Sequence, residues 1–208
     1  MISNINSPFV SQTFAEGQRY FMGEGKLNNA LERLSHDLRD HKIDYMVIGA
    51  IALLAHGYPR FTQDIHLVMT GEGLEKFHQE LVGLGYAPSF PNARKRLRST
   101  TDNVSIEVML SGEYPGDGKP KPVSMPVPST ASQEIDGIKF VTLEKLIELK
   151  LASGISAPDR LKDLADVQEL IKLRKLDSTF AENLDPYVRG KFLELQAAVG
   201  TKQGQEQE

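Results

Sequence analysis

Cysteine is absent from the sequence. This excludes disulfide bonds and thiolate metal sites, and it suits a reducing compartment, so a cytoplasmic location is expected. Long apolar runs are also missing, since no stretch approaches the roughly 18 uninterrupted apolar residues of a membrane span. The start, MISNINSPFVSQTF, has no basic segment followed by an apolar one. We therefore expect a protein that is neither exported nor embedded in a membrane.

Positive charge is not in excess. Twenty-four Lys and Arg stand against 28 Asp and Glu, a formal net charge of -4. No global cationic field would hold long nucleic acid, and any such contact must be local. With 40% hydrophobic and 25% charged residues, the 208-residue chain resembles an ordinary globular protein. It is long enough for one domain with a small helical appendage.

The first half of the sequence predicts a mixed β-sheet flanked by helices. Apolar residues recur at three- and four-residue steps from Leu27 to Leu38, which indicates one face of a helix. Short apolar runs over residues 45–48 and 65–69 indicate buried strands, each followed by a helical pattern. Further strands are expected between residues 86 and 110, where apolar and polar residues alternate.

The second half predicts a loop and then helices. Eight of the 17 residues from Gly112 to Pro128 are Gly or Pro, which is typical of a loop, and this loop could cover or border a site. After a last strand over residues 138–141, Thr142 is expected to cap a helix, although Lys145 cannot complete a capping box. Further helices are expected over residues 158–174 and 186–198.

The expected fold class is therefore α+β. An N-terminal arm over residues 1–25 precedes an α/β core over 26–141, a C-terminal helical bundle over 142–198 and a flexible tail over 199–208.

The segment VIGAIALLAHGYPRFTQDIHLVM carries most of the chemical information. Asp64 and His66 lie two positions apart on an expected strand, and alternate strand residues face the same side. The two side chains therefore project together, beside the turn at Gly49. A glycine at a strand end lets backbone N–H groups approach a phosphate, and the following helix adds the positive end of its dipole. The simpler interpretation of Gly49 is a turn alone.

Glu107 lies between Ile106 and Val108 on a later expected strand. If that strand adjoins the strand of Asp64, Glu107 completes a cluster of three groups that could bind a divalent cation. The alternative is that Glu107 points to solvent from a half-buried strand.

These motifs resemble the polymerase-β-like nucleotidyltransferase superfamily, especially its minimal branch of AbiEii-type toxins and MNT-like enzymes. The family pattern is a hydrophobic residue, Gly, and Gly or Ser; a short helix; Asp-hydrophobic-Asp or Glu; and a third acid on a later strand. The matching positions are Ile48-Gly49-Ala50, Asp64-Ile65-His66 and Glu107. The resemblance covers about residues 30 to 175. It includes LIELKLASGISAPDRLKDLADVQELI, which is similar to the family's Lys-bearing helix and Arg-x-Lys-Asp motif.

The resemblance implies metal-dependent transfer of a nucleoside monophosphate from an NTP to a hydroxyl of a small molecule, protein or RNA. It implies Mg²⁺ or Mn²⁺ held by Asp64, His66 and Glu107, with Glu107 also the general base. The nucleotide contacts that it implies are Gly49, Ala50, Arg60, Thr62, Lys150 and Lys162. A cognate antitoxin-like partner is implied as well, whereas the acceptor is not identified by the sequence.

Three departures from the family pattern affect the expected chemistry. Ala50 replaces Gly or Ser and still permits close approach of a phosphate. His66 replaces the second acid, which removes a negative charge and an oxygen ligand of the kind that Mg²⁺ prefers. Glu107 is one methylene longer than Asp, which displaces the general base unless the backbone compensates. The alternative function is therefore a degenerate module that binds a nucleotide or a partner without chemistry.

Several charged residues have two interpretations. Lys150 and Lys162 either face the triphosphate or solvate a helix surface. The patch of Arg94, Lys95, Arg96 and Arg98 either attracts RNA or a nucleotide, or protects an edge strand. Asp163 and Asp166, one helical turn apart, are expected to pair with Lys162 and neighbouring cations on the helix surface.

Overall fold

The first part of the chain combines strands with helices, and a computed structural model describes the chain over residues 25–205. The elements of this part are α2 (Lys26–Asp40), β1 (Tyr45–Ile48), α3 (Gly49–Ala55), β2 (Asp64–Met69), α4 (Gly71–Glu80), β3 (Tyr86–Pro88), β4 (Arg96–Ser99), β5 (Ser105–Leu110), α5 (Pro128–Ala131), β6 (Ser132–Ile135) and β7 (Ile138–Val141). Helices follow: α6 (Leu143–Ser156), the 3₁₀ turn η1 (Pro158–Arg160), α7 (Leu161–Arg174), the 3₁₀ turn η2 (Ser178–Asn183) and α8 (Pro186–Gln205). The arm expected over residues 1–25 lies, apart from Gly25, outside the described residues.

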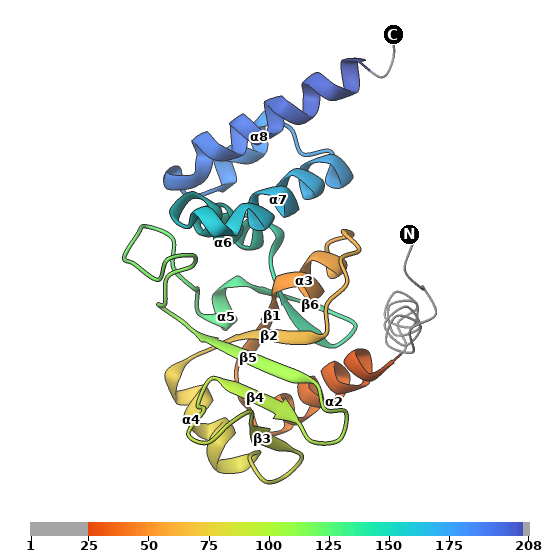
Figure 1. Cartoon of the computed structure of the whole chain (residues 1–208), viewed down its shortest axis with the longest axis vertical. Helices are drawn as coiled ribbons and strands as arrows, with labels where there is room; N and C mark the ends of the chain where they lie inside the picture. The colour runs from red at the N-terminus through yellow and green to blue at the C-terminus, as the bar shows by residue number, and fades with distance from the viewer. Residues whose placement is uncertain (1–24, 206–208) are drawn as a thin grey trace, which may run out of the picture.

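The seven strands form one mixed sheet in the order β3-β4-β5-β2-β1-β7-β6 (Figure 1). β2 runs parallel to β5 and antiparallel to β1, and β1 runs parallel to β7. This arrangement confirms the expected α+β class. It also places the end of β1 and the start of β2 at the same edge of the sheet.

The two faces of the sheet have different coverings because side chains alternate along each strand. On one face, Ile65, Leu67 and Ile106 are almost fully buried. α2 and α4 cover this face: the hydroxyl of Tyr86 donates to Asp37 of α2, and its ring meets Phe77 of α4. The other face, which carries Asp64 and His66, stays partly open to solvent.

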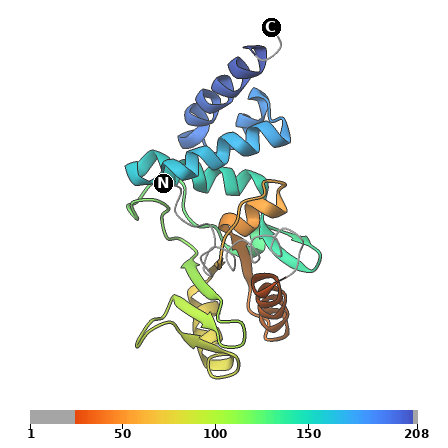
Figure 2. The ribbon, with the colours of Figure 1, turned by 45° about the vertical axis from the view of Figure 1, so that its right-hand side comes forward.

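The three C-terminal helices form a layer beyond the edge of the sheet that carries α3 (Figures 1 and 2). The hydroxyl of Thr142 caps α6 by accepting from the backbone N–H of Lys145. Buried apolar residues such as Leu170 and Phe192 join the helices to one another and to the core. None of the helices within residues 25–205 combines the length and apolar character needed to cross a bilayer.

Several boundaries differ from the sequence expectations. The sequence indicates a helix from about Glu72 to Leu84, but α4 ends at Glu80, because the chain turns at Gly83, whose φ is +91°. The strand β6 and the short helix α5 were not expected, since SQEI has no clear apolar alternation. α8 extends to Gln205, beyond the expected end at Ala198; the sequence holds no proline there to stop it.

The explanation of the Arg94–Arg98 patch as a charged edge strand is wrong. β4 is hydrogen-bonded on both sides, to β3 and to β5, so the edge strand on this side of the sheet is β3. Sequence position alone could not reveal this, because the short strand Tyr86–Pro88 is hard to recognise. Three of the four cations are instead paired with acids: Arg94 meets Glu75, Lys95 meets Glu113 and Arg96 meets Glu107.

Candidate functional site

Asp64, His66 and Glu107 come together on the open face of the sheet. Asp64 and His66 alternate along β2, and the parallel pairing of β2 with β5 sets His66 beside Glu107. The Nε2 atom of His66 lies 3.0 Å from Oδ2 of Asp64 and 3.6 Å from Oε2 of Glu107. The imidazole therefore lies between two carboxylates.

The environment of Asp64 favours its ionised form. The hydrogen bond from His66 lowers the pKa of Asp64 to about 2, against the opposing effect of burial, and a hydrogen bond from Thr62 helps. An ionised carboxylate can only accept hydrogen bonds, so Nε2 of His66 carries the hydrogen of this contact. The ring therefore presents its other nitrogen, Nδ1, toward Gly49.

Gly49 has to be a glycine in this arrangement. Its φ is +74°, a conformation that residues with a side chain rarely adopt. A Cβ atom at this position would lie 3.1 Å from Nδ1 of His66. The turn at the end of β1 and the imidazole thus fit closely, and Ala50 follows in the first turn of α3.

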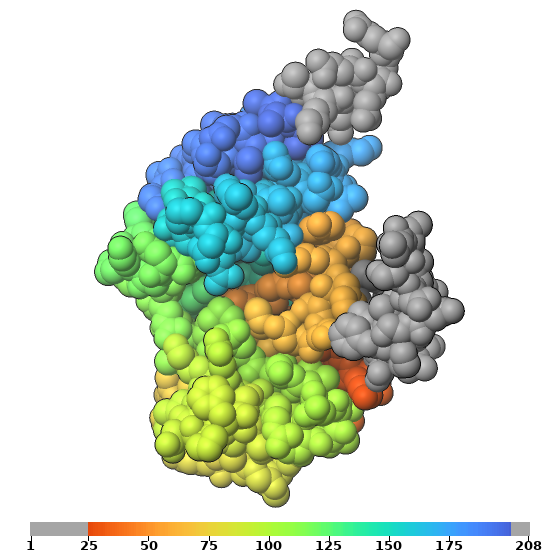
Figure 3. Space-filling model, in the orientation of Figure 1, coloured from red at the N-terminus to blue at the C-terminus, as the bar shows by residue number. Residues whose placement is uncertain are grey.

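A cleft of about 290 Å³ opens next to this group. The sheet edge contributes Gly49, His66, Glu107 and Met109, and the loop after β5 contributes Tyr114, Pro115, Gly116 and Met125. The helical layer supplies the remaining wall through Leu146, Leu149, Lys150, Ser153, Arg160 and Asp163. Figure 3 shows this layer resting on both the segment around α3 and the loop. The expectation that the loop borders a site is consistent with this placement.

Lys150 reaches the cleft from within a buried ion-pair network. Its Nζ atom lies 2.9 Å from Asp163 and 2.7 Å from Asp166, and Asp166 also accepts from Arg60. Burial opposes ionisation of Asp163, but the charge of Lys150 and a hydrogen bond from Ser153 lower its pKa overall. The network ties α6 and α7 to the loop before β2, and so it fixes the wall of the cleft.

The expected partner of Asp163 and Asp166 is therefore wrong. These carboxylates face the buried Lys150, whereas Lys162 is exposed on α7 and does not line the cleft. One position along a helix turns a side chain by about 100°, so Lys162 and Asp163 point in different directions. Arg60 and Thr62, expected at the nucleotide, hold Asp166 and Asp64 respectively.

The side chains as they lie here do not form a metal site. Within residues 25–205, no three His, Asp or Glu side chains are arranged to hold a metal ion. The reason is His66, whose N–H group is directed at one carboxylate and lies close to the other. Mg²⁺ would require oxygen ligands in octahedral geometry at this place. The arrangement therefore does not fit the ion that the resemblance implies.

Sequence reasoning missed two residues of the cleft, Arg160 and Tyr114. Arg160 is exposed, and its guanidinium makes no hydrogen bond with residues 25–205, although its charge helps to lower the pKa of Asp163. Arg160 is the arginine of the Arg-x-Lys-Asp motif noted in the sequence, which was an available signal. Tyr114 stands in a Gly/Pro-rich loop, whose path no local pattern predicts.

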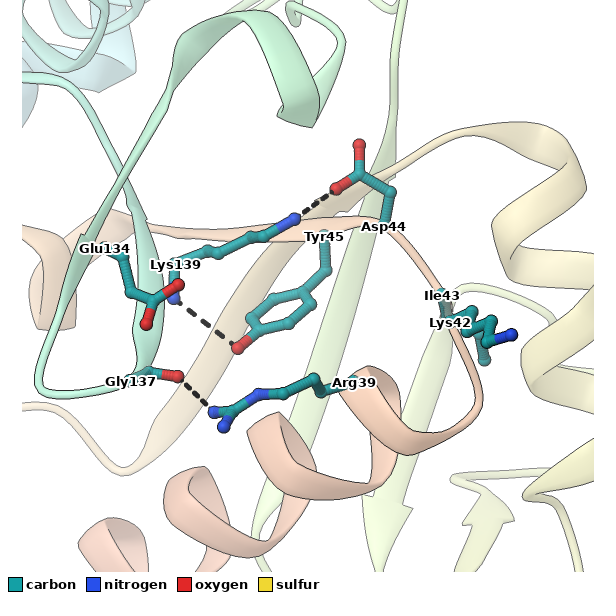
Figure 4. A pocket seen from close by; sticks show the side chains of 8 residues that line it. All are labelled: Arg39, Lys42, Ile43, Asp44, Tyr45, Glu134, Gly137 and Lys139. Carbon is teal, nitrogen blue, oxygen red and sulfur yellow. Dashed lines mark hydrogen bonds and ion pairs between the residues drawn. The ribbon is translucent and has the colours of Figure 1, made fainter.

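A second cavity, of about 250 Å³, lies where α2 ends and β1 begins, beside the β6–β7 hairpin (Figure 4). Two of its cations already have partners: Lys139 binds Asp44 at 2.7 Å, and Arg39 donates to the carbonyl of Gly137. None of the residues singled out from the sequence lines it.

No protein-family model and no curated protein matches the chain. Among solved structures, it is similar to an antigenic nucleotidyltransferase-like protein from Paracoccidioides brasiliensis (17% identity, 71% of this chain and 76% of that chain, TM-score 0.46). It is also similar to JHP933 from Helicobacter pylori (14% identity, 88% and 94%, TM-score 0.46). A third similar structure is ANT(2")-Ia in complex with adenylyl-2"-tobramycin (13% identity, 85% and 97%, TM-score 0.48). All three scores lie below 0.5, so the proposals below depend on the residues of this chain.

Proposed function

We propose that this chain binds a nucleoside triphosphate in the cleft, with the site layout of a nucleotidyltransferase. One observation carries the proposal: the Gly49 turn, the His66–Glu107 pair, and the cations Lys150 and Arg160 line a single cleft. These parts come from distant segments of the sequence. Their order along the chain is the one that the resemblance to nucleotidyltransferases rests on.

The cationic wall supplies donors for phosphate. Two of the three N–H groups of Lys150 bind Asp163 and Asp166, which leaves the third for a ligand. Arg160 adds a planar guanidinium of the kind that binds phosphate oxygens in pairs. Gly49 has no side chain, so a phosphate can approach its backbone closely.

Because of His66, nucleotide binding without efficient transfer of the nucleoside monophosphate is better supported than catalysed transfer. Its ring, hydrogen-bonded to Asp64, lies where a cation would have to bind between the carboxylates. The carboxylates of Asp64 and Glu107 thereby both interact with the His66 ring. Triphosphate binding then depends on the cations of the helical wall.

Transfer to a hydroxyl acceptor is a second candidate, favoured by the position of Glu107 in the wall of the cleft. In that reaction the acceptor oxygen bonds to the α-phosphorus, the bond to pyrophosphate breaks, and the acceptor proton passes to the Glu107 carboxylate. Glu107 is 41% exposed and therefore accessible to an acceptor from solvent.

Titration calorimetry with ATP and the other NTPs, with and without Mg²⁺ or Mn²⁺, tests binding. We expect binding that persists without metal and weakens in the Lys150→Met variant. Pyrophosphate release over the same conditions tests transfer. No binding of any NTP would overturn the proposal, and metal-dependent pyrophosphate release would make transfer the function.

Membership of the AbiEii-type branch and a cognate antitoxin-like partner also belong to the proposal, and both rest on the resemblance alone. Arrest of bacterial growth on expression of the chain is the expected result of a toxin. Normal growth at high expression would overturn the toxin-like part of the proposal.

A further inference from the structure

The lining of the cleft is apolar as well as charged. Met109, Pro115, Met125, Leu146 and Leu149 are apolar residues of its lining, and Tyr114 is the one Phe, Tyr or Trp among the described residues there. Apart from Ile48, the rest of the lining is polar, charged or glycine: Gly49, His66, Glu107, Gly116, Lys150, Ser153, Arg160 and Asp163. A ligand that matches both kinds of lining has a flat apolar ring joined to a charged group, as a nucleotide does.

Tyr114 is held by a loop that the structure fixes at several points. The Nζ atom of Lys121 lies 5.9 Å from the centroid of the Tyr114 ring, and it donates to the carbonyl of Pro115 and to Asp117. The backbone N–H of Met125 donates to the carbonyl of Glu113 at 2.7 Å. The ring therefore stays in place without the entropy cost of ordering a free loop.

The loop is also pressed against α6. Gly116, with φ of +74°, lies so close to the helix that a Cβ atom would be 2.7 Å from the carbonyl oxygen of Ser153. The phenol hydroxyl of Tyr114 makes no hydrogen bond to any residue of the described chain. Tyr114 thus has no structural hydrogen bond to maintain, while its ring lines the cleft.

We propose that Tyr114 is the residue on which the base of the nucleotide stacks. Bases stack on aromatic side chains because both present π-faces, and the methionines beside Tyr114 adapt to a ring edge. The inference rests on the proposed function, because it assigns the base end of the same cleft. The phosphates then lie toward Lys150 and Arg160.

The experiment compares ATP with inorganic tripolyphosphate, which has the charge of the ligand without the base. Calorimetry is performed on the unchanged chain, on Tyr114→Ala and on Tyr114→Phe. Tyr114→Ala should weaken ATP binding roughly fivefold to 150-fold, the range of one base–aromatic stack, and leave tripolyphosphate binding unchanged. Tyr114→Phe keeps the ring and should bind ATP within about twofold of the unchanged chain.

Three results would overturn these statements in different ways. If the unchanged chain binds neither ATP nor any other NTP, the proposed function itself fails; if it binds another NTP in place of ATP, that NTP is used in the comparison. If it binds ATP and Tyr114→Ala binds equally well, the stacking assignment fails alone. An equal loss of ATP and tripolyphosphate binding in Tyr114→Ala would also overturn the assignment, because it would show a collapsed loop.

Discussion

His66→Asp should convert the candidate site into one that binds Mg²⁺. The substitution removes the imidazole between Asp64 and Glu107 and adds a third carboxylate beside them. Mg²⁺ prefers such oxygen ligands and a high local negative charge. The unchanged chain, whose imidazole lies 3.0 Å and 3.6 Å from the two carboxylates, should bind the ion weakly.

Without metal, the variant should be less stable than the unchanged chain. It loses the hydrogen bond between His66 and Asp64, worth about 1 kcal/mol. It also gains like-charge repulsion of about 1 kcal/mol at roughly 4 Å, the value for groups screened by water as these partly exposed ones are. The total of about 2 kcal/mol corresponds to a Tm lower by about 4–8 °C for a chain of this size.

Mg²⁺ should reverse this loss. An ion at about 100 times its Kd stabilises the folded state by about 2.7 kcal/mol. Thermal unfolding with and without Mg²⁺, together with calorimetry of the ion alone, measures both effects. His66→Asn is the matched control, because it removes the imidazole without adding charge and should not respond to Mg²⁺. The reasoning is refuted if His66→Asp and His66→Asn respond alike, since the new carboxylate would then not face Asp64.

Three further predictions follow from other parts of the structure. Asp166→Ala removes the buried carboxylate that Lys150 and Arg60 share and should lower the free energy of unfolding in urea by about 3 kcal/mol. Glu169→Ala, which breaks an exposed pair with Lys172, should change it by less than about 0.5 kcal/mol, and equal effects would contradict the buried network. The pKa of Asp64 is depressed to about 2, so its contribution to stability is present above its unfolded pKa near 3.8 and is lost as pH falls toward 2. The free energy of unfolding of the unchanged chain should therefore exceed that of Asp64→Asn by about 1 kcal/mol at pH 5, after allowance for solvent exposure. If this difference in stability does not shrink between pH 4 and pH 2, the His66 hydrogen bond is not its source. Gly116→Ala should weaken ATP binding, because its new methyl group meets the carbonyl of Ser153. Gly118→Ala is the control: Gly118 has a similar positive φ but lies in open space, so this variant should bind ATP normally. Identical affinities of the two variants would show that the loop does not depend on the contact with Ser153.

Local patterns predicted the elements that carry the site. The four-residue run 45–48 and the helical spacing of residues 27–38 depend only on which residues follow one another, and both elements appear as expected. The shared direction of Asp64 and His66 follows from the two-residue period of a strand. Gly49 and the capping Thr142 are likewise local features, since backbone conformation at one residue decides them.

The partners of these residues could not be predicted in the same way. Lys150 and Asp166 were expected near phosphate and at a helix surface, yet each is the other's buried partner. The Arg94–Arg98 patch was explained as an edge, yet β4 is internal because β3 pairs outside it. In both cases the outcome depends on which element packs beside which, and periodicity along the chain carries no such information.

The sequence by itself therefore determined most of the strands and helices, the Gly49 turn and the common direction of Asp64 and His66. Only the tertiary structure decided that Glu107 adjoins His66, through the parallel pairing of β2 with β5. It also decided that Tyr114 and Arg160 line the same cleft as Gly49. The physical reason is that backbone preferences act over a few residues, whereas contacts between distant segments are selected by burial of the shared apolar core.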